Sequence, residues 1–487
     1  MLSYRKLAMC VLGRPLHTGG IDSPRPASQR AAAFILTAAM LTTLAAPAFA
    51  GTWYIEDGDI TVKASGTEGK NTVSQGNKKD VEDTDTIITN QKTDTASSHT
   101  VTIDARSDKV EVTLQDVNIK ADSGSALTSK GDVTLTLKGE NHLTGGNGSG
   151  NSSDGSGISS RGSLTITGGE TDSLTAKGGS GEKGGDGIYS SERVAISGGT
   201  VTATGGDSTG SDGSGGYGIY SSGVTISGGT VTANGGSGKD GSGDGIFSFD
   251  PVAISGGTVT AKGGSGEDGS GGRGIYSIKS VTISGGTVTA NGGDGKNGSG
   301  GSGIFSLGRV AISGSTVNAA GGSSGSSNGG SGIYSSGIDL SGSLELTAKA
   351  GSPNGKALSQ KGSELDLNAI KDKLGPGAKV TATDAGGKVI DQIPIPRPVE
   401  PEESSSSSDG GSATPSAPAS PLPGLTVTDK DGQRISYTST QSGNALTVCV
   451  GRLTASFRIS LAALRQLRAE GIETITFQTI LCSTTLS

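Results

Sequence analysis

Aromatic residues are scarce in this chain. They make up 3% of its 487 residues, and tryptophan occurs once. Hydrophobic residues of all kinds reach only 31%, whereas glycine alone occurs 86 times. A globular core of this size needs many bulky apolar side chains, so the composition excludes an ordinary large globular fold and is typical of a repeat protein.

Two other regular patterns are absent. The glycine-rich region does not show the apolar spacing of an amphipathic helix. Glycine does not recur at every third position, which excludes a collagen triple helix. A disordered Gly/Ser linker remains as an alternative, but it gives no reason for the phrase VxISGGTVTA to recur in register.

The chain does contain a repeat of nearly constant length. The tetrad GI(Y/F)S recurs at intervals of 31, 27, 29, 29 and 29 residues, and degenerate copies are centred on Leu127 and Ile158. A period in this range predicts units that cannot bury a core alone and must stack on their neighbours. The tetrads place isoleucine at Ile188, Ile219, Ile246, Ile275, Ile304 and Ile333.

Each unit contains three short segments with strand patterns, namely GIYS, VAISGG and TVTAKGG. Val252 and Ile254, then Val259 and Ala261, alternate with small polar residues, as in strands buried on one face. Glycine pairs suit the corners between strands. We therefore predict an all-β fold, a right-handed parallel β-helix with one coil per repeat and a glycine-rich loop at the same corner of each coil. Eight such coils would extend roughly 40 Å.

The N-terminal 50 residues have the features of a secretory signal. Arg25 and Arg30 precede the apolar run AAAFILTAAMLTTLAAPAFA, which ends in the small-residue pattern of Ala48 and Ala50. We expect cleavage after Ala50 and a secreted, extracellular or cell-surface protein. Cys10 fits a lipoprotein signal poorly, since no apolar stretch precedes it. After cleavage, no segment is apolar enough to span a membrane.

The mature chain divides into three parts. Residues 51–390 form the solenoid, with Trp53 plugging its N-terminal end and a short helix in ELDLNAIKDKLGPG capping the other. Residues 391–424 are a Pro/Ser-rich linker expected to be disordered. Residues 425–487 read as a small α+β module with a helix in LAALRQLRAEG, and the module is short enough to be incomplete.

The net charge argues against some classes of binding partner, and the cysteine content limits the possible disulfide and zinc sites. The formal charge is −7 overall, and because residues 1–50 carry five basic groups and one acid, the remainder stands at −11. An acidic surface argues against nucleic acid and anionic membranes. Cys449 and Cys482 could form a disulfide or remain unrelated thiols, and no Cys/His spacing suits zinc.

Several phrases resemble a known family. TWYIEDGDITV, VTLQDVNIKADSGSAL, VTLTLKGENHLTGG and the ISGGTVTA series, spread over residues 51–350, resemble the secreted carbohydrate-binding β-helix proteins of clostridial-type Gram-positive bacteria. The resemblance implies a parallel β-helix related in shape to polysaccharide lyases, with a polysaccharide or cell-surface glycan as its partner. The Gly/Asp loops here are longer and more regular than that family leads us to expect.

Residues suited to catalysis are few. β-Helix glycosidases and lyases use paired carboxylates, or a basic group beside calcium-bound acids. The mature chain has only His99 and His142, both in polar surroundings, and it has no adjacent Asp-Asp pair on a strand. We interpret the protein as non-catalytic, with a polysaccharide lyase or glycoside hydrolase as the less favoured alternative.

The aromatic residues of the tetrads are the most regular candidate site. If each isoleucine points inward, alternation sends the next residue outward, so that six rings form one column. The rings could stack on one another beneath the loops, or present a strip to sugar rings. The candidate carbohydrate-binding residues are Tyr189, Tyr220, Phe247, Tyr276, Phe305 and Tyr334.

The loop aspartates are candidate calcium ligands. Carboxylate and carbonyl oxygens are the ligands that Ca²⁺ takes, and the loops place Asp212, Asp240, Asp268 and Asp294 near one corner of successive coils. The nonapeptide period of calcium-binding rolls is absent. Solvated Asp-Gly turns therefore remain the alternative.

The sequence thus predicts a secreted, non-catalytic rod that binds polysaccharide through a repeated face. The alternative is a structural spacer or adhesin shaft that binds no sugar.

Overall fold

The computed structural model describes residues 51–393, except 68, 148–154 and 212, together with separate segments between 425 and 486. The chain forms two compact units, residues 1–400 and 401–487. The expected signal peptide and nearly all of the expected linker lie outside the described residues.

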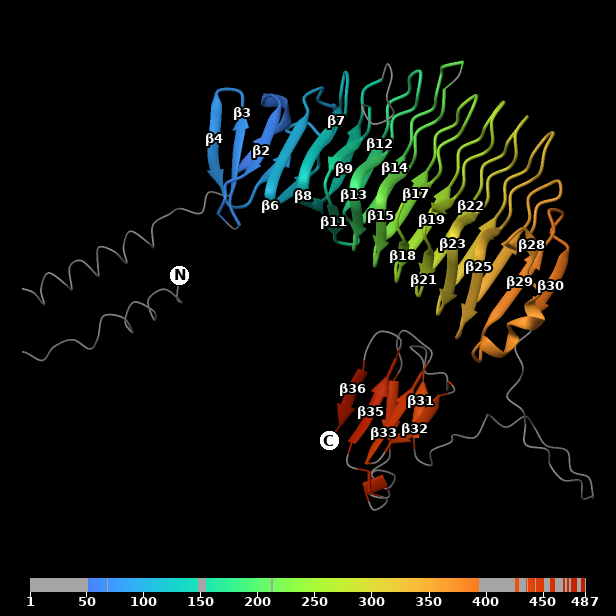
Figure 1. Ribbon diagram of the computed structural model, residues 1–487. Helices are drawn as coiled ribbons and strands as arrows, with labels where there is room; N and C mark the ends of the chain where they lie inside the picture. The colour runs from blue at the N-terminus through green and yellow to red at the C-terminus, as the bar shows by residue number, and fades with distance from the viewer. Residues whose placement is uncertain are drawn as a thin grey trace, which may run out of the picture. The chain divides into compact units, whose positions relative to one another are not determined.

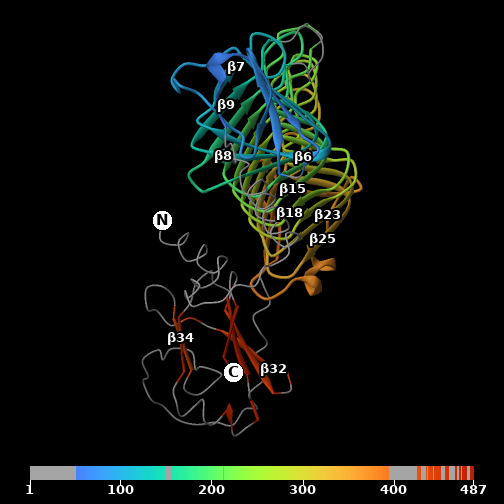
Figure 2. The same ribbon diagram turned by 90° about the vertical axis from the view of Figure 1, so that its left-hand side faces the viewer.

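The first unit is a β-solenoid of stacked parallel coils (Figure 1). One coil consists of β17 (Ile246–Ser248), β18 (Val252–Ile254) and β19 (Thr258–Lys262). The three strands per coil confirm the pattern expected from the repeat. In several coils the first two strands join into one bent strand, as in β13 (Ile188–Ile196). Figure 2 shows the coils one behind another.

The tetrad isoleucines form a single interior column. From Ile188 to Ile333 they pair with one another in parallel register, and all are fully buried. This confirms the expected column. The strands of this first ladder are β8 (Leu127–Lys138), β10 (Ile158–Arg161), β13, β15 (Ile219–Ile226), β17, β20 (Ile275–Ser277), β23 (Ile304–Ser313), β25 (Ile333–Ser341) and β27 (Leu358–Gln360).

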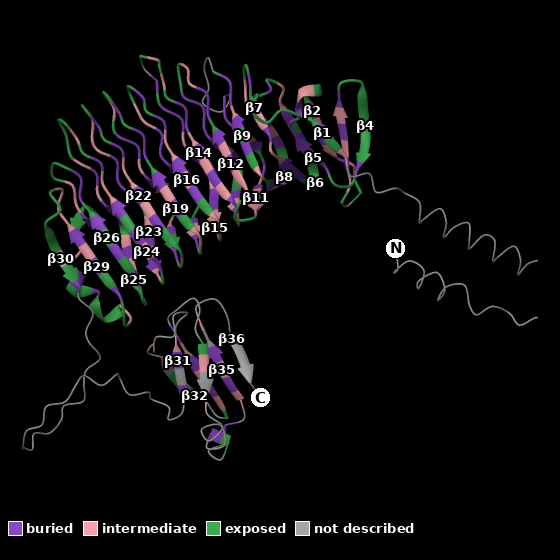
Figure 3. Cartoon of the chain, turned by 180° about the vertical axis from the view of Figure 1, so that it is seen from behind, coloured by how far each residue is buried: buried purple, intermediate pink, exposed green. Residues whose placement is uncertain are grey.

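The other two ladders complete the core. A second ladder continues through the later parts of the bent strands and through β11 (Leu164–Gly168), β18 and β21 (Val281–Ile283). The third is a separate sheet of 11 strands. Its inward valines and alanines alternate with outward residues, seen as purple and pink or green stripes in Figure 3. Its strands are β7 (Asn118–Lys120), β9 (Glu140–Thr144), β12 (Ser173–Lys177), β14 (Thr200–Thr204), β16 (Thr230–Asn234), β19, β22 (Thr287–Asn291), β24 (Thr316–Ala320), β26 (Glu345–Lys349), β29 (Lys379–Thr383) and β30 (Val389–Ile393).

A column of buried serines joins the first ladder to the corner that follows. The Ser221 hydroxyl donates to the carbonyls of Glu192 (2.6 Å) and Gly223 (2.9 Å), and Ser248 donates to Asp250 (2.7 Å). Each serine thereby ties its strand to the backbone of the bend that follows. The tetrad carries the serine that makes this corner, a role that the sequence pattern did not indicate.

The N-terminal end is closed by an antiparallel meander. β2 (Ile60–Ala64), β3 (Asn71–Gln75) and β4 (Lys78–Asp83) pair in that order. Trp53 is buried in the end of the core and donates from Nε1 to Asp83 Oδ2 at 2.7 Å, as expected for a plug. The remaining elements here are β1 (Thr52–Tyr54), a 3₁₀ turn η1 (Ile55–Asp57), β5 (Ile87–Thr89) and β6 (Val101–Gln115).

The C-terminal end is capped by short helical turns, as expected. The helical part of the capping segment is two 3₁₀ turns, η2 (Leu367–Ala369) and η3 (Lys371–Lys373). Leu367 and Ile370 both bury against the last coil. The short strand β28 (Ser363–Glu364) and the antiparallel strand β30 complete this end.

The second unit is built mainly of strands in its described part. β32 (Thr438–Ser442), β33 (Ala445–Cys449), β35 (Thr474–Gln478) and β36 (Ser483–Leu486) form one sheet, in which β33 and β35 are parallel. β31 (Leu425–Thr428) pairs with β34 (Ser456–Ile459). Most of the expected helix lies outside the described residues, as does Cys482, so the pairing of the two cysteines stays a prediction.

Candidate functional site: the glycine blade and its two sides

The glycine-rich loops form an ordered blade. Each loop leaves a strand of the third sheet by an outgoing leg and enters the next first-ladder strand by a returning leg, and the loops stand side by side in Figure 1. Gly236 N donates to Gly216 O (2.8 Å), Gly243 N to Gly236 O (2.9 Å) and Gly264 N to Gly243 O (2.9 Å). This hydrogen-bond chain alternates between the two legs from Gly155 to Gly355. The loops of this glycine blade that are described without a gap are residues 178–187, 235–245, 263–274, 292–303 and 321–332.

Glycine is required because the legs are in direct backbone contact. A Cβ atom on Gly264 would lie 2.0 Å from the Gly236 carbonyl oxygen, and one on Gly293 would lie 1.8 Å from that of Gly264. No side chain fits at these positions. The backbone of the legs is paired with neighbouring loops, while Asp240 and Asp268 near the loop tips are exposed, as in the solvated turns kept as the alternative to calcium.

The aromatic column lies at the root of the returning leg. Parallel register places the six rings from Tyr189 to Tyr334 one above another. Tyr220 and Phe247 stack with centroids 5.0 Å apart and planes at 11°, and Phe305 stacks on Tyr334 at 4.7 Å. Tyr276 is perpendicular to both neighbours, with interplanar angles of 80° and 85°. Stacked rings cover each other's faces, so most of their remaining exposed surface is ring edge.

A second row of apolar side chains runs beside the rings. Phe249 is 42% exposed and Leu307 is 53% exposed. Ile278, which is partly exposed, holds the equivalent position in the coil between them. Phe249 makes edge-to-face contacts with Tyr220 (5.6 Å) and Phe247 (4.9 Å). Together the six rings, Phe249, Ile278 and Leu307 form what we call the apolar strip. Its second row was missed from the sequence, although FSF, YSI and FSL in successive tetrads carried the signal.

Titratable side chains occupy the position two residues before the first four of the six column isoleucines. The Arg273 guanidinium lies over the rings of Tyr276 (4.4 Å) and Phe305 (4.5 Å), and it is 3.9 Å from Asp244. In an earlier coil, the Tyr217 ring packs against the column and its N–H donates to Asp186 Oδ1 at 2.8 Å. These residues support the rings from the blade side, and the sequence analysis did not single them out.

Burial changes the acidity of this group. Burial raises the pKa of Asp186 to about 8, although the Tyr217 N–H opposes the rise. Burial raises the pKa of Asp244 to about 6, and the nearby Arg273 charge opposes it. The Tyr217 pKa is also raised, by burial and by both carboxylates. The root of the blade therefore holds carboxyls that are easily protonated.

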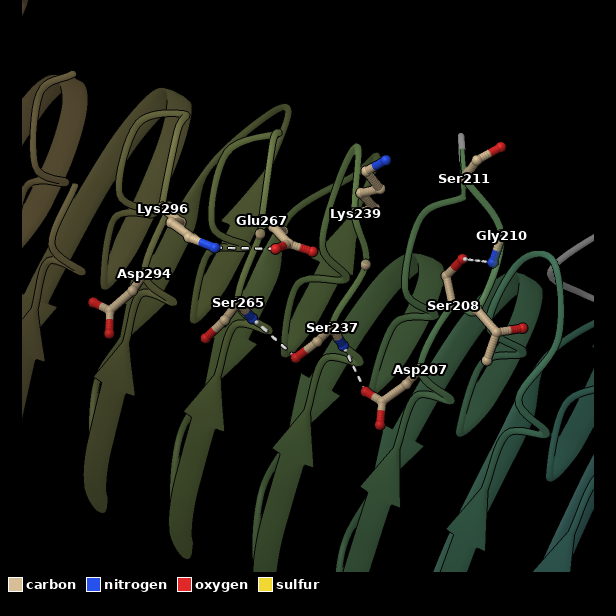
Figure 4. Close-up of a pocket in the computed structure, with 13 residues that line it drawn as sticks. Asp207, Ser208, Gly210, Ser211, Ser237, Lys239, Ser265, Glu267, Asp294 and Lys296 are labelled. Atoms are coloured by element: carbon tan, nitrogen blue, oxygen red, sulfur yellow. Dashed lines mark hydrogen bonds and ion pairs between the residues drawn. The ribbon is translucent and has the colours of Figure 1, made fainter. Parts of the chain in front are cut away.

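A polar groove lies along the outgoing legs. It has a volume of about 810 Å³. Figure 4 shows Asp207, Ser237, Ser265 and Asp294 just beyond the ends of the third-sheet strands. Ser237 N donates to Asp207 Oδ1 at 2.8 Å, Ser265 N donates to Ser237 Oγ at 3.3 Å, and Lys296 Nζ is 3.1 Å from Glu267. The groove is lined by Asp207, Ser208, Thr209, Gly210, Ser211, Ser237, Gly238, Lys239, Ser265, Gly266, Glu267, Asp294 and Lys296.

The three described calcium candidates lie in equivalent loops but not in one column. The register of the loop tips places Asp240 beside Asp268, whereas Asp294 belongs to the column at the start of the outgoing leg. Asp268 accepts from Asn297 Nδ2 at 2.8 Å and lies 3.7 Å from Lys239 Nζ. Asp212 lies outside the described residues. Within the described part of the chain, no group of three or more acidic, histidine or cysteine side chains is arranged to hold a metal ion.

His99 and His142, the histidines of the described residues, lie apart from this region. His99 is half exposed, with Nδ1 3.6 Å from Asp59, and His142 is an exposed residue of β9.

Comparison with protein families, with characterised proteins and with solved structures returned no match. In the part of the chain that the structure describes, no helix has the length and apolar character needed to cross a membrane.

Proposed function

We propose that the protein is a secreted, non-catalytic solenoid that binds polysaccharide along the apolar strip. The observation that supports this proposal is the continuity of the strip over six successive coils, where half-buried rings adjoin the exposed Phe249 and Leu307. Sugar rings bind aromatic and apolar side chains through their C–H faces. The partly exposed Arg273 adds hydrogen-bond donors within the same surface.

The repeat favours one kind of ligand over another. One partly exposed ring contributes only about 1 kcal/mol, so a single coil would bind weakly. A polymer that contacts several coils at once converts later contacts into intramolecular ones, and its affinity rises with its length. The strip therefore suits a long polysaccharide better than a short oligosaccharide.

The shaft remains a second candidate, favoured by the ring stacking. Tyr220 and Phe247 cover each other's faces, and Phe247 is only 8% exposed. Rings used in this way stabilise the coils without a ligand. In this case the rod would only hold its two ends apart.

Removing the exposed row tests the proposal without dismantling the stack. The variant Phe249→Ser/Leu307→Ser should lose at least tenfold in affinity for the polysaccharide that retains the wild type in pull-downs. The matched control is Val389→Ser/Ile390→Ser, which removes side chains of similar exposure, 46% and 47%, from β30. It should bind like the wild type. If no polysaccharide in a broad insoluble panel retains the wild type, the shaft function stands instead.

A further inference from the structure

The polar groove continues a regular hydroxyl surface. Thr202, Thr232, Thr260 and Thr289 pair in parallel register and point outward from the third sheet. Strand geometry sets these hydroxyls about 4.8 Å apart along the rod. The outgoing legs that follow the same strands carry the groove, and Thr204, Asn234, Lys262 and Asn291 stand between the threonine row and the groove.

The acids of the groove are held in fixed positions. Asp207 Oδ1 accepts from Ser237 N at 2.8 Å, and Asp294 Oδ1 accepts from Ser323 N at 2.7 Å. Among the described residues, no hydrogen bond reaches the second carboxylate oxygen of either aspartate. Asp207 and Asp294 thus each use one oxygen in a hydrogen bond to the next coil and leave the other to accept a hydrogen bond from a ligand, while Ser237 and Ser265 occupy the position in the two coils between them.

The charges of the groove favour a hydroxyl-rich, uncharged ligand. Asp207, Glu267 and Asp294 are balanced in part by Lys239 and Lys296, and Lys296 already pairs with Glu267. Neither an anionic nor a cationic polymer meets a surface of one sign. Sugar hydroxyls can donate to the carboxylates and accept from the ammonium and serine groups.

The groove and the apolar strip lie on different legs of the blade. The groove residues follow the third sheet on the outgoing legs, whereas the rings follow the returning legs. The hydrogen-bonded glycines of the two legs lie between them. A ligand in the groove therefore does not occupy the strip, and two polymer chains could be held at once.

We propose that the groove is a second binding site, for uncharged polysaccharide, and that the rod bridges two polymer chains. The bridging half of this inference rests on the proposed function of the apolar strip. The groove site itself stands on the groove geometry alone.

The test uses the full chain with soluble β-glucan, xylan and mannan, and with polygalacturonate as an anionic comparison. The groove variant is Asp207→Asn/Ser265→Leu, and Ser323→Leu is its control, since Ser323 continues the same column beyond the groove. Affinity electrophoresis measures binding, and light scattering of polymer mixtures measures bridging. We expect the groove variant to lose at least tenfold in scattering while the control scatters like the wild type.

The outcomes separate the two proposals. Phe249→Ser/Leu307→Ser should also lose bridging but keep binding to a neutral polysaccharide through the groove. A groove variant that bridges as well as the wild type overturns the inference, as does a strip variant with no residual binding to any of the three neutral polymers. If the groove variant alone abolishes all binding, the groove is the sole site and the strip proposal fails.

Discussion

Asp186 is a carboxylic acid that burial keeps protonated at neutral pH, since its pKa is raised to about 8. A group whose pKa is higher in the folded than in the unfolded state binds its proton more tightly when folded. Its contribution to stability is therefore complete at acidic pH and declines as pH rises from the unfolded value toward the folded one. Asp244, with a pKa of about 6, behaves alike over a narrower range.

We predict that the solenoid becomes less stable as pH rises from 4 to 8, by about 1.4 kcal/mol per pH unit for each titrating group. Asp244 is almost fully ionised by about pH 7, and of these two groups only Asp186 still contributes above that pH. Asp186→Asn keeps the acceptor for the Tyr217 N–H and should flatten the melting temperature between pH 6 and 8. Asp207→Asn, at an exposed position, is the control and should leave the slope as it is. Equal slopes for the wild type and Asp186→Asn would contradict the assignment.

A second prediction concerns single glycines of the blade. Gly293→Ala places a methyl group against the Gly264 carbonyl and should lower the free energy of unfolding by about 3 kcal/mol. In Gly223→Ala, the nearest atoms are 3.9 Å from the new Cβ, so the change should stay within about 1 kcal/mol. Urea unfolding of both variants checks the difference. Similar losses for both would mean that the blade is not close-packed.

At the residue scale, the sequence predicted the interior more fully than the surface. Ile188 and its equivalents could be assigned to the core because, in a stacked coil, the apolar residues of an alternating strand point inward. The roles of Asp186 and Arg273 could not, because they depend on which side chains neighbouring coils place beside them. Those neighbours come from parallel register, which one coil alone does not reveal.

The aromatic column is a stabilising element whatever it binds. We predict that Tyr220→Ala/Phe247→Ala/Tyr276→Ala destabilises the solenoid by several kcal/mol, because Phe247 is nearly buried between its neighbours. Phe247→Tyr should be tolerated, since tyrosine occupies the same position in adjacent coils. Thermal melts followed by circular dichroism measure both. An unchanged melting temperature for the triple variant would show that the rings do not hold the coils together.

At the element scale, the three strands of each coil followed from the sequence but the loops did not. Val252 and Ile254 carry an alternation that identifies their strand. In the loop, glycine has no Cβ atom, and this suits a solvated turn as well as a leg packed closely against its neighbours. The composition of the loop therefore does not distinguish the two. At the C-terminal cap the sequence indicated a short helix but not its type, and the structure forms two 3₁₀ turns there.

At the scale of the whole molecule, the coil is the unit that can be added or removed. We predict that deleting residues 275–303, one 29-residue period from Ile275 to Gly303, leaves a folded, shorter solenoid. The new junction joins Gly274 to Ile304, so that every interior column stays in register. Circular dichroism and the melting temperature should remain close to those of the wild type. Deleting residues 275–288 instead interrupts the columns within a coil and should abolish cooperative melting.

The glycine hydrogen-bond chain also affects the response of the rod to force. Its bonds connect each loop to the one before it, from Gly155 to Gly355, so pulling the ends of the solenoid apart loads them in succession. The terminal coil has a neighbour on one side only, and it should detach first. Each released period of 29 residues lengthens the chain by up to about 100 Å. The next coil still presents an unpaired strand edge on which the released segment can fold again. A rod anchored at both ends would therefore extend stepwise under tension and recover its length when the tension falls.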